Sequence, residues 1–229
     1  DDNCPNTPNN TSVNNSGCSL IKLDENGTTL KATFYASDYL GEVVLYKGDS
    51  VMIVRDWNHI RSLGPSTYNK EVRFATSFIE EIRELCSLPC VISDKFDMSS
   101  WDVSGVKSMY FTFWNTNGFN QDISNWDVSK VYLINCMFCL SQFNGDASNW
   151  DVSSVTYMDN MFNSSQFTGD ISNWDVSSVT NMTQMFWNSV FNQDLSNWNV
   201  NNVTECTSFS RYNTKWTLPK PNFTNCNPD

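Results

Sequence analysis

The sequence predicts an α+β fold: a solenoid of about five 24-residue coils that follows a small N-terminal β/α cap domain. Tryptophan recurs at spacings of 25, 24, 24 and 24 residues, which is the signature of a stacked repeat. The segment before the repeats instead has short apolar patterns typical of strands. Aromatic residues make up 14% of the chain, more than a disordered chain carries. The recurring residues are Trp101, Trp126, Trp150, Trp174 and Trp198.

Apolar residues keep fixed positions around each Trp. One 24-residue coil cannot bury such a face alone, but stacked coils can. We therefore expect columns of Trp, Val, Met and Phe inside the stack. The columns are Met98, Ile123, Ala147, Ile171 and Leu195; Val103, Val128, Val152, Val176 and Val200; Val106, Val131, Val155, Val179 and Val203; Met109, Ile134, Met158, Met182 and Cys206; Phe113, Phe138, Phe162 and Phe186; and Phe119, Phe143, Phe167 and Phe191.

Each coil is expected to contain one short strand, one short helix and a corner. The apolar-x-x-Trp-x-Val pattern has the alternation of a strand. The Ser three residues after the Trp, as in Ser153 and Ser177, can cap a helix whose apolar residues follow at three-residue steps. A Phe-Asn-Gln or Phe-x-Gly corner then closes the coil.

The chain is expected to divide into four parts. Residues 1–19 are rich in turn residues and predict a disulfide-closed loop. Residues 20–95 are the cap domain, residues 96–210 the repeat solenoid, and residues 211–229 a C-terminal cap tail.

Within the cap domain, strands are predicted at residues 30–35, 42–46 and 50–54, with turns at 26–27 and 47–49. Apolar residues at helical spacing predict a short helix at residues 78–85.

Charge and composition exclude several functions. The net charge is −11, which disfavours nucleic acid as a partner because phosphates need Lys and Arg. No apolar run approaches the ~18 residues of a membrane span. The chain has one His, His59, which leaves little room for His-based catalysis or a His-rich metal site.

The cysteines indicate an oxidising, extracellular compartment. Eight Cys fall as four close pairs, although eight allow 105 pairings, so pairing of neighbours is only preferred. The 136–139 pair could also be a redox pair or half of a zinc site. The start at Asp1 suggests a mature form or a fragment. The cysteines are Cys4, Cys18, Cys86, Cys90, Cys136, Cys139, Cys206 and Cys226, and Asn-x-Ser/Thr glycosylation acceptors are Asn9, Asn10, Asn14, Asn26, Asn163, Asn181, Asn202 and Asn222.

Polar ladders are the candidate binding residues. Asp follows four successive Trp residues and should point away from the core, and Asn precedes the Trp in a parallel row. The Asp row predicts either hydrogen bonding to nearby turns or a face that binds a cation or ligand. The candidate ligand-binding face comprises Asp102, Asp127, Asp151, Asp175, Asn125, Asn149 and Asn173. The Asn row continues to Asn197, and Asn199 replaces Asp in the last coil, which fits an edge coil more than a ligand site.

The Asn row can equally satisfy its own amides between coils. A second acidic row is interpreted as corner capping. Trp114 and Trp187 fall outside the repeated apolar positions and are the candidates for exposed aromatics. The second row is Asp122, Asp146, Asp170 and Asp194.

The phrase Ser-Asn-Trp-Asp-Val-Ser-Ser-Val-Thr-Asn-Met at residues 172–182 closely resembles the BspA-like leucine-rich repeat surface proteins, known in bacteria as a 26-residue surface-protein repeat and domain of unknown function. Residues 23–31 look like the segment that often precedes such repeats. Residues 2–8 are similar to the end of a thrombospondin type 3 calcium repeat, whose Asp-x-Asp-x-Asp-Gly run is missing here. The resemblance implies a leucine-rich-repeat-like solenoid on secreted or surface-anchored proteins, with adhesion as the usual function and no catalytic chemistry.

We therefore expect a non-enzymatic, extracellular surface protein that binds protein or glycan on a cell surface. The alternative is a structural subunit that assembles with copies of itself into an extracellular fibre. A hydrolase is disfavoured, because identical Asp ladders do not provide a pair of carboxylates in different environments. No cofactor is expected, and calcium is the one candidate cation.

Overall fold

The computed structural model describes residues 12, 20–23, 30–32, 40, 42–47, 49–56, 58, 72–83 and 98–229. The chain divides into two compact units. Unit 1 comprises residues 1–80 and 95–105, and unit 2 comprises residues 81–94 and 106–229. No helix in the described ranges is both long enough and apolar enough to cross a membrane.

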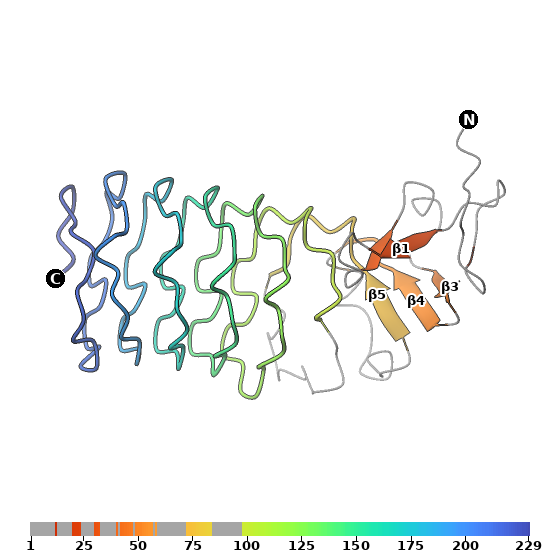
Figure 1. The fold of residues 1–229 in the computed structure, drawn as a ribbon, viewed down its shortest axis with the longest axis horizontal. Coiled ribbons are helices and arrows are strands. Elements are labelled where there is room, and N and C mark those ends of the chain that lie inside the picture. The colour runs from red at the N-terminus through yellow and green to blue at the C-terminus, as the bar shows by residue number, and fades with distance from the viewer. Residues whose placement is uncertain are drawn as a thin grey trace. The chain divides into compact units, whose positions relative to one another are not determined.

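Unit 1 contains two small sheets. Strands β1 (Ile21–Leu23) and β2 (Leu30–Ala32) pair antiparallel. Strand β4 (Asp49–Ile53) lies between β3 (Val43–Tyr46), its antiparallel partner, and β5 (Val72–Ala75), its parallel partner (Figure 1). The strands expected at 30–35, 42–46 and 50–54 correspond to β2, β3 and β4, while the sequence did not predict β1 and β5.

The hairpin between β3 and β4 has a two-residue loop, because Tyr46 pairs with Asp49. Lys47 has a φ of 52°, as the first loop position of a type I′ turn requires. The core of this unit contains residues 51–54, which are buried, and the Phe74 and Trp101 rings, whose centroids lie 6.4 Å apart.

The helix predicted at residues 78–85 is wrong for residues 78–83, which have no helical structure; residues 84 and 85 lie outside the described ranges. The Ile79 amide instead closes a turn on the Thr76 carbonyl (2.9 Å). The Ile82 amide donates to the carbonyl of Ser108 (2.9 Å), beside a parallel bridge between Glu81 and Ser108. The helix fails because its amides are committed elsewhere, although Ile79 and Ile82 are buried as the pattern requires.

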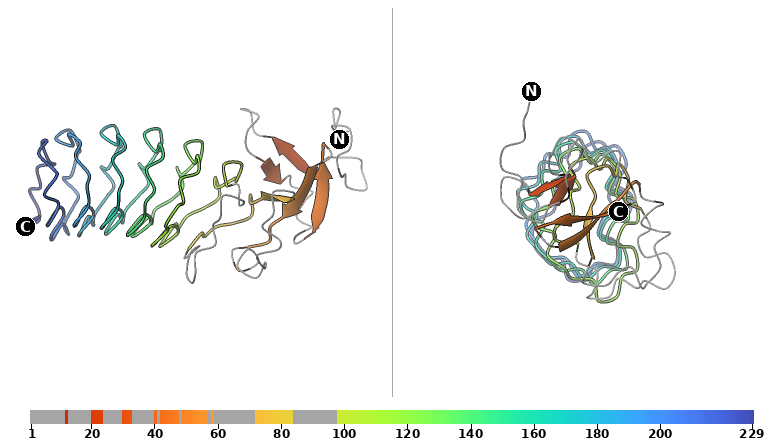
Figure 2. Two further views of the ribbon diagram at one scale, coloured as in Figure 1. Left: turned by 90° about the horizontal axis from the view of Figure 1, so that it is seen from below. Right: turned by 90° about the vertical axis from the view of Figure 1, so that its right-hand side faces the viewer.

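In unit 2, successive 24-residue repeats lie side by side (Figures 1 and 2). One parallel bridge joins each repeat to the next. Positions are counted below from the Trp of each repeat, which is position 0. The bridged residues, all at position +7 except the first, are Glu81, Ser108, Leu133, Tyr157, Asn181 and Glu205.

A backbone hydrogen-bond ladder extends from this bridge. Amides at positions +8, +10, +12 and +14 donate to the next repeat, as Met158, Asn160, Phe162 and Ser164 do at 3.0, 2.9, 2.9 and 2.8 Å. Most of the amides between them close tight turns; that of Asn163, for example, bonds the Asn160 carbonyl (3.0 Å).

This arrangement differs from the expected short strand and short helix in each coil. Residues 98–229 contain turns and isolated bridges but no helix and no strand. Half of the amides that a helix would use bond the next repeat instead, and most of the others reach back three residues. Both arrangements place an apolar residue inward every three positions, so the sequence pattern alone does not separate them.

The predicted apolar columns are buried at every position. Phe rings stack from repeat to repeat, with centroids 5.4, 5.8 and 5.5 Å apart from Phe113 through Phe138 and Phe162 to Phe186. Indole N–H groups also join repeats: those of Trp150 and Trp174 donate to the carbonyls of Ile123 (3.1 Å) and Ala147 (2.9 Å). A buried indole therefore has its required partner.

The tail packs on the last repeat. Trp216 is buried against the rings of Phe186, Phe191 and Phe209. The Leu195 amide donates to the Pro219 carbonyl (3.0 Å). A disulfide joins Cys206 to Cys226 and a second joins Cys136 to Cys139. The other four cysteines, Cys4, Cys18, Cys86 and Cys90, lie outside the described residues.

Candidate functional site

The Asp at position +1 caps a tight turn in successive repeats. One carboxylate oxygen of Asp151 accepts bonds from the amide (3.1 Å) and hydroxyl (2.6 Å) of Ser153. Asp127 makes the same pair of bonds with Ser129 at the same lengths. Ser153 was expected to cap a helix, and instead its hydroxyl is a donor within this turn. The bonds are those that local Asp and Ser side chains make in turns rather than those of a ligand site.

Asp102 differs from the other members of its row. Its carboxylate accepts the Ser104 amide (3.1 Å) and hydroxyl (2.6 Å), but the residue is only 4% exposed. Thr76, which follows β5, donates its hydroxyl to the Asp102 carbonyl (2.9 Å). The expectation that Asp102 lies on an open face is therefore wrong, because the residue is buried.

The second acidic row caps the other turn. Asp122, Asp146, Asp170 and Asp194 each accept the amide of the Ser two residues later, at 3.0, 2.8, 2.9 and 2.9 Å. Bonds from the Ser hydroxyl and amide lower the pKa of Asp122 and Asp194 below the ordinary value of 3.8, and bonds from the Ser amide and hydroxyl do the same for Asp146 and Asp170. Bonds from Ser177 lower the pKa of Asp175 in the same way.

The Asn row is exposed at Asn125, Asn149 and Asn173. In residues 98–229 no side-chain hydrogen bond joins these amides, so the expected amide ladder between coils does not form. The described ranges also hold no group of three or more His, Cys, Asp or Glu that could bind a metal ion. The Asp/Asn face thus offers exposed amides beside carboxylates that are already used in turns.

Asp151→Ala is expected to lower the free energy of unfolding by about 1 kcal/mol, because it removes two hydrogen bonds of one turn. Urea unfolding followed by circular dichroism measures this effect. Asn149→Ala, two positions earlier and equally exposed, is the control and should leave stability unchanged. Equal stability of the two variants would show that the Asp row does not hold the turns.

A second face is marked by differences among the repeats. Asp and Ser recur in almost every repeat at the capped turns, whereas positions +9, +10, +13 and +14 hold a different set in each. The ladder aligns each of these positions with its equivalent in the next repeat, so they form parallel columns. We call them the variable face: Tyr110, Phe111, Trp114, Asn115, Asn135, Cys136, Cys139, Leu140, Asp159, Asn160, Asn163, Ser164, Thr183, Gln184, Trp187, Asn188, Thr207, Ser208, Arg211 and Tyr212.

The backbone of this face is left-handed at two positions in each repeat, +10 and +14. Ten residues there have φ between 51° and 62°, and none is Gly. A side chain in this conformation costs roughly 1–2 kcal/mol relative to the right-handed form, and Gly would avoid the cost. Retaining side chains as large as Phe111 and Tyr212 at such positions is a common feature of functional surfaces.

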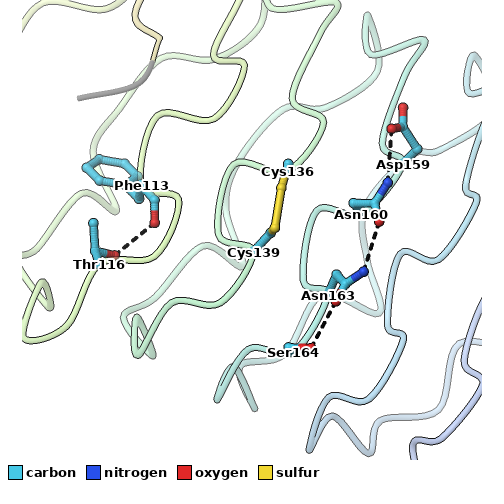
Figure 3. Close-up of a disulfide and its surroundings, with 8 residues drawn as sticks. All are labelled: Phe113, Thr116, Cys136, Cys139, Asp159, Asn160, Asn163 and Ser164. Atoms are coloured by element: carbon cyan, nitrogen blue, oxygen red, sulfur yellow. Dashed lines mark hydrogen bonds between the residues drawn. A yellow bond between two sulfur atoms is a disulfide. The ribbon is translucent and has the colours of Figure 1, made fainter. Parts of the chain in front are cut away.

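In the first three repeats the side chains at +10 and +13 contact each other, and the kind of pair differs each time. Phe111 and Trp114 form an edge-on ring pair with centroids 5.6 Å apart. Cys136 and Cys139 form a disulfide, and in the next repeat Asn163 donates to the Asn160 side-chain oxygen (2.9 Å) (Figure 3). The disulfide therefore occupies a pairing position that other repeats fill with rings or amides.

Partly exposed aromatic rings lie at both ends of the variable face. In the first repeat Tyr110 and Phe111 have ring centroids 4.2 Å apart. In the last two, Trp187 and Tyr212 have centroids 5.5 Å apart, and the Arg211 guanidinium lies 5.0 Å from the Tyr212 ring centre. The sequence predicted Trp114 and Trp187 as exposed aromatics, and both are partly exposed. The sequence analysis missed Tyr110, Phe111 and Tyr212. A search for residues that differ from the repeat consensus would have found them.

A hydrogen-bonded polar chain lies between the aromatic ends (Figure 3). Asn160 donates to the Asp159 carboxylate (3.3 Å), and Ser164 donates to the Asn163 side-chain oxygen (3.0 Å). Asn188 of the next repeat donates to the Ser164 hydroxyl (3.3 Å). Burial raises the pKa of the Asp159 carboxyl, and the Glu205 carboxylate adds to the shift.

Stability is expected to fall when the pH drops below about 4. The turn-capping carboxylates have lowered pKa values in the folded state, so they stabilise it above their unfolded pKa and lose this effect as the pH falls through the folded pKa. Asp159 makes the opposite contribution to stability. Because its pKa is raised in the folded state, its ionised form destabilises that state, and this cost is absent while the carboxyl is protonated. Asp159→Asn should therefore raise the melting temperature at pH 7 and have little effect below pH 4. The melting temperatures of the parent and of Asp159→Asn are measured from pH 3 to pH 8. A difference between the two that stayed constant with pH would contradict this prediction.

Comparison with known proteins gives one family. A family model described as "Mycoplasma protein of unknown function, DUF285" matches residues 71–165 and 139–218. Together these matches span more than half of the chain. Neither the curated proteins nor the solved structures contain a match to it.

Proposed function

The chain belongs to the family described as "Mycoplasma protein of unknown function, DUF285", and we propose that it is a non-enzymatic extracellular surface protein that binds protein or glycan through its variable face. The observation that carries the proposal is the set of aligned positions +9, +10, +13 and +14, which hold a different combination of side chains in every repeat. Residues needed only to close and stack the repeats recur. Side chains that recognise a partner have no reason to recur.

The architecture we propose is a leucine-rich-repeat-like solenoid, in which short repeats share a continuous core. Its support is the 24-residue period of buried columns and the hydrogen-bond ladder between repeats. Repeat proteins of this kind bind partners through an extended surface to which every repeat contributes. Trp, Tyr and Arg, found here at Trp114, Trp187, Tyr212 and Arg211, are enriched at the energetic centres of protein interfaces.

Extracellular location is supported by the two disulfides of unit 2, since disulfides persist mainly in oxidising compartments. A non-enzymatic role is supported by the carboxylate rows. The members of the second row are exposed and bonded to equivalent Ser residues, so they lack the paired, unlike environments of acid and base catalysts. The fibre alternative needs an end open to another copy, and the tail covers the last repeat in the described part of the chain.

The test compares two faces of one protein in a cell-binding assay. The variable-face variant carries Trp187→Ala and Tyr212→Ala, and the Asp/Asn-face variant carries Asn149→Ala and Asn173→Ala. We expect the variable-face variant to bind cells from the protein's natural environment with at least tenfold lower apparent affinity than the parent. The Asp/Asn-face variant should bind with less than twofold lower affinity. Selective loss in the second variant would instead assign binding to the Asp/Asn face. Polymerisation of the parent into regular fibres, seen by electron microscopy, would favour the structural subunit.

A further inference from the structure

Most backbone amides of the variable face are not available to a partner. Its amides at +8, +10, +12 and +14 bond the next repeat, and most of those between close turns within the repeat. A peptide that adds a strand needs a row of unpaired backbone groups. Recognition on this face must therefore come from side chains.

The side chains divide into flat aromatic ends and an amide-rich centre. Three repeat steps separate Trp114 from Trp187, which is roughly 15 Å at the ~4.8 Å spacing of paired backbones. Asn160 and Asn163 lie in the repeat before that of Trp187. Each of these two amides uses one donor and one acceptor in the polar chain, and an Asn side chain has two of each. The centre is thus held in position and keeps hydrogen-bonding capacity, which lowers the entropic cost of binding.

Charge narrows the class of ligand further. Residues 106–229 contain ten Asp or Glu and five Lys or Arg, so this unit repels anionic polymers. On the variable face Arg211 is the one cationic residue, and it already lies over the Tyr212 ring. These side chains suit a neutral ligand with flat apolar faces and many hydroxyls. The apolar faces would pack on the aromatic rings at the two ends, and the hydroxyls would bond the amides between them.

We propose that the variable face binds a neutral glycan chain that lies along the stack of repeats. Sugar rings pack on Trp114 and on the Trp187–Tyr212 pair, and their hydroxyls bond the side chains of Asn160 and Asn163. This assignment rests on the proposed function and adds the class of the partner. An extended peptide is the competing occupant and is separated from the glycan by the experiment.

The probe is an array of purified neutral and anionic oligosaccharides, together with protein-coated surfaces. The chain is produced in an oxidising host without N-glycosylation, because Asn163 lies in an Asn-x-Ser acceptor on the variable face. Parent protein is compared with Trp187→Ala, Trp187→Leu, Asn163→Ala and the control Asn149→Ala. Melting curves of every variant establish that each one is folded.

We expect the parent to bind neutral oligosaccharides of several rings. Trp187→Ala and Trp187→Leu should both lose at least tenfold in affinity, because Leu keeps apolar bulk but no flat ring. Asn163→Ala should lose about fivefold and Asn149→Ala less than twofold. Full retention by Trp187→Leu would show that the ring acts only in packing and would overturn the assignment.

Two further outcomes separate this inference from the proposed function. Binding to protein-coated surfaces or anionic glycans alone, still lost in Trp187→Ala, would overturn the neutral glycan and leave the binding module standing. Neutral-glycan binding that Trp187→Ala leaves intact and Asn149→Ala abolishes would overturn the variable face as its site. Absence of binding to every probe and to cells would overturn both proposals.

Discussion

Trp150→Ala is expected to lower the free energy of unfolding by about 3–5 kcal/mol, the usual cost of deleting a buried Trp. The ring is 4% exposed and lies 6.2 Å from Phe138 and 6.4 Å from Trp174, between centroids. Its indole N–H also bonds the Ile123 carbonyl at 3.1 Å. One substitution therefore removes contacts to the repeats on both sides and one of two hydrogen bonds to the Ile123 carbonyl, which also accepts the Trp126 amide (3.1 Å).

Urea unfolding of Trp150→Ala and of its exposed neighbour variant Asn149→Ala measures this effect. Since each repeat depends on its neighbours, several should unfold together at a lower denaturant midpoint. A midpoint equal to that of the parent would contradict the buried Trp column.

Trp216→Ala is expected to cost about 3–4 kcal/mol and to open the C-terminal end of the stack first. The ring centroids of Phe186 and Phe191 lie 5.1 and 5.0 Å from that of Trp216, and its indole donates to the Gln193 carbonyl (3.0 Å). Without this ring the last Phe side chains face water. Thermal unfolding with hydrogen exchange should show early exposure of residues 195–229.

Leu218→Ala is the matched control, because Leu218 lies in the same tail and is 42% exposed. It should cost less than 0.5 kcal/mol, as surface substitutions usually do. Equal effects of the two substitutions would show that the tail does not cover the last repeat.

The periodic part of the core could be predicted because each column repeats the same apolar residue at one position. The local backbone could not. Val155, Met158 and Met161 are spaced by three, which suits both a helix and successive tight turns. The choice depends on where alternate amides bond, and the partner of the Met158 amide, the Asn181 carbonyl, lies 23 residues away.

The candidate site shows a different limit. The sequence analysis looked for residues that recur in every repeat and so identified the Asp and Asn rows. In the structure, the Asp residues cap turns. The residues that now support a binding face, such as Tyr110 and Arg211, belong to no consensus. Asp102 could not be distinguished from Asp127 by sequence, because both precede the same Val-Ser pair, and the contact of the Asp102 carbonyl with Thr76 joins residues 26 apart in the chain.

The hydrogen-bond ladder also gives the stack of repeats an electrical direction. Between the second and third repeats, the amides of Ile134, Cys136, Phe138 and Leu140 all point toward the C-terminal end, whereas those of Thr156, Tyr157 and Gln166 point back. In an ordinary sheet such peptide dipoles alternate and largely cancel, but here the forward set outnumbers the other. Aligned peptide dipoles sum as they do in a helix. The repeats thus have a small net dipole whose positive end points toward the C-terminal end of the stack.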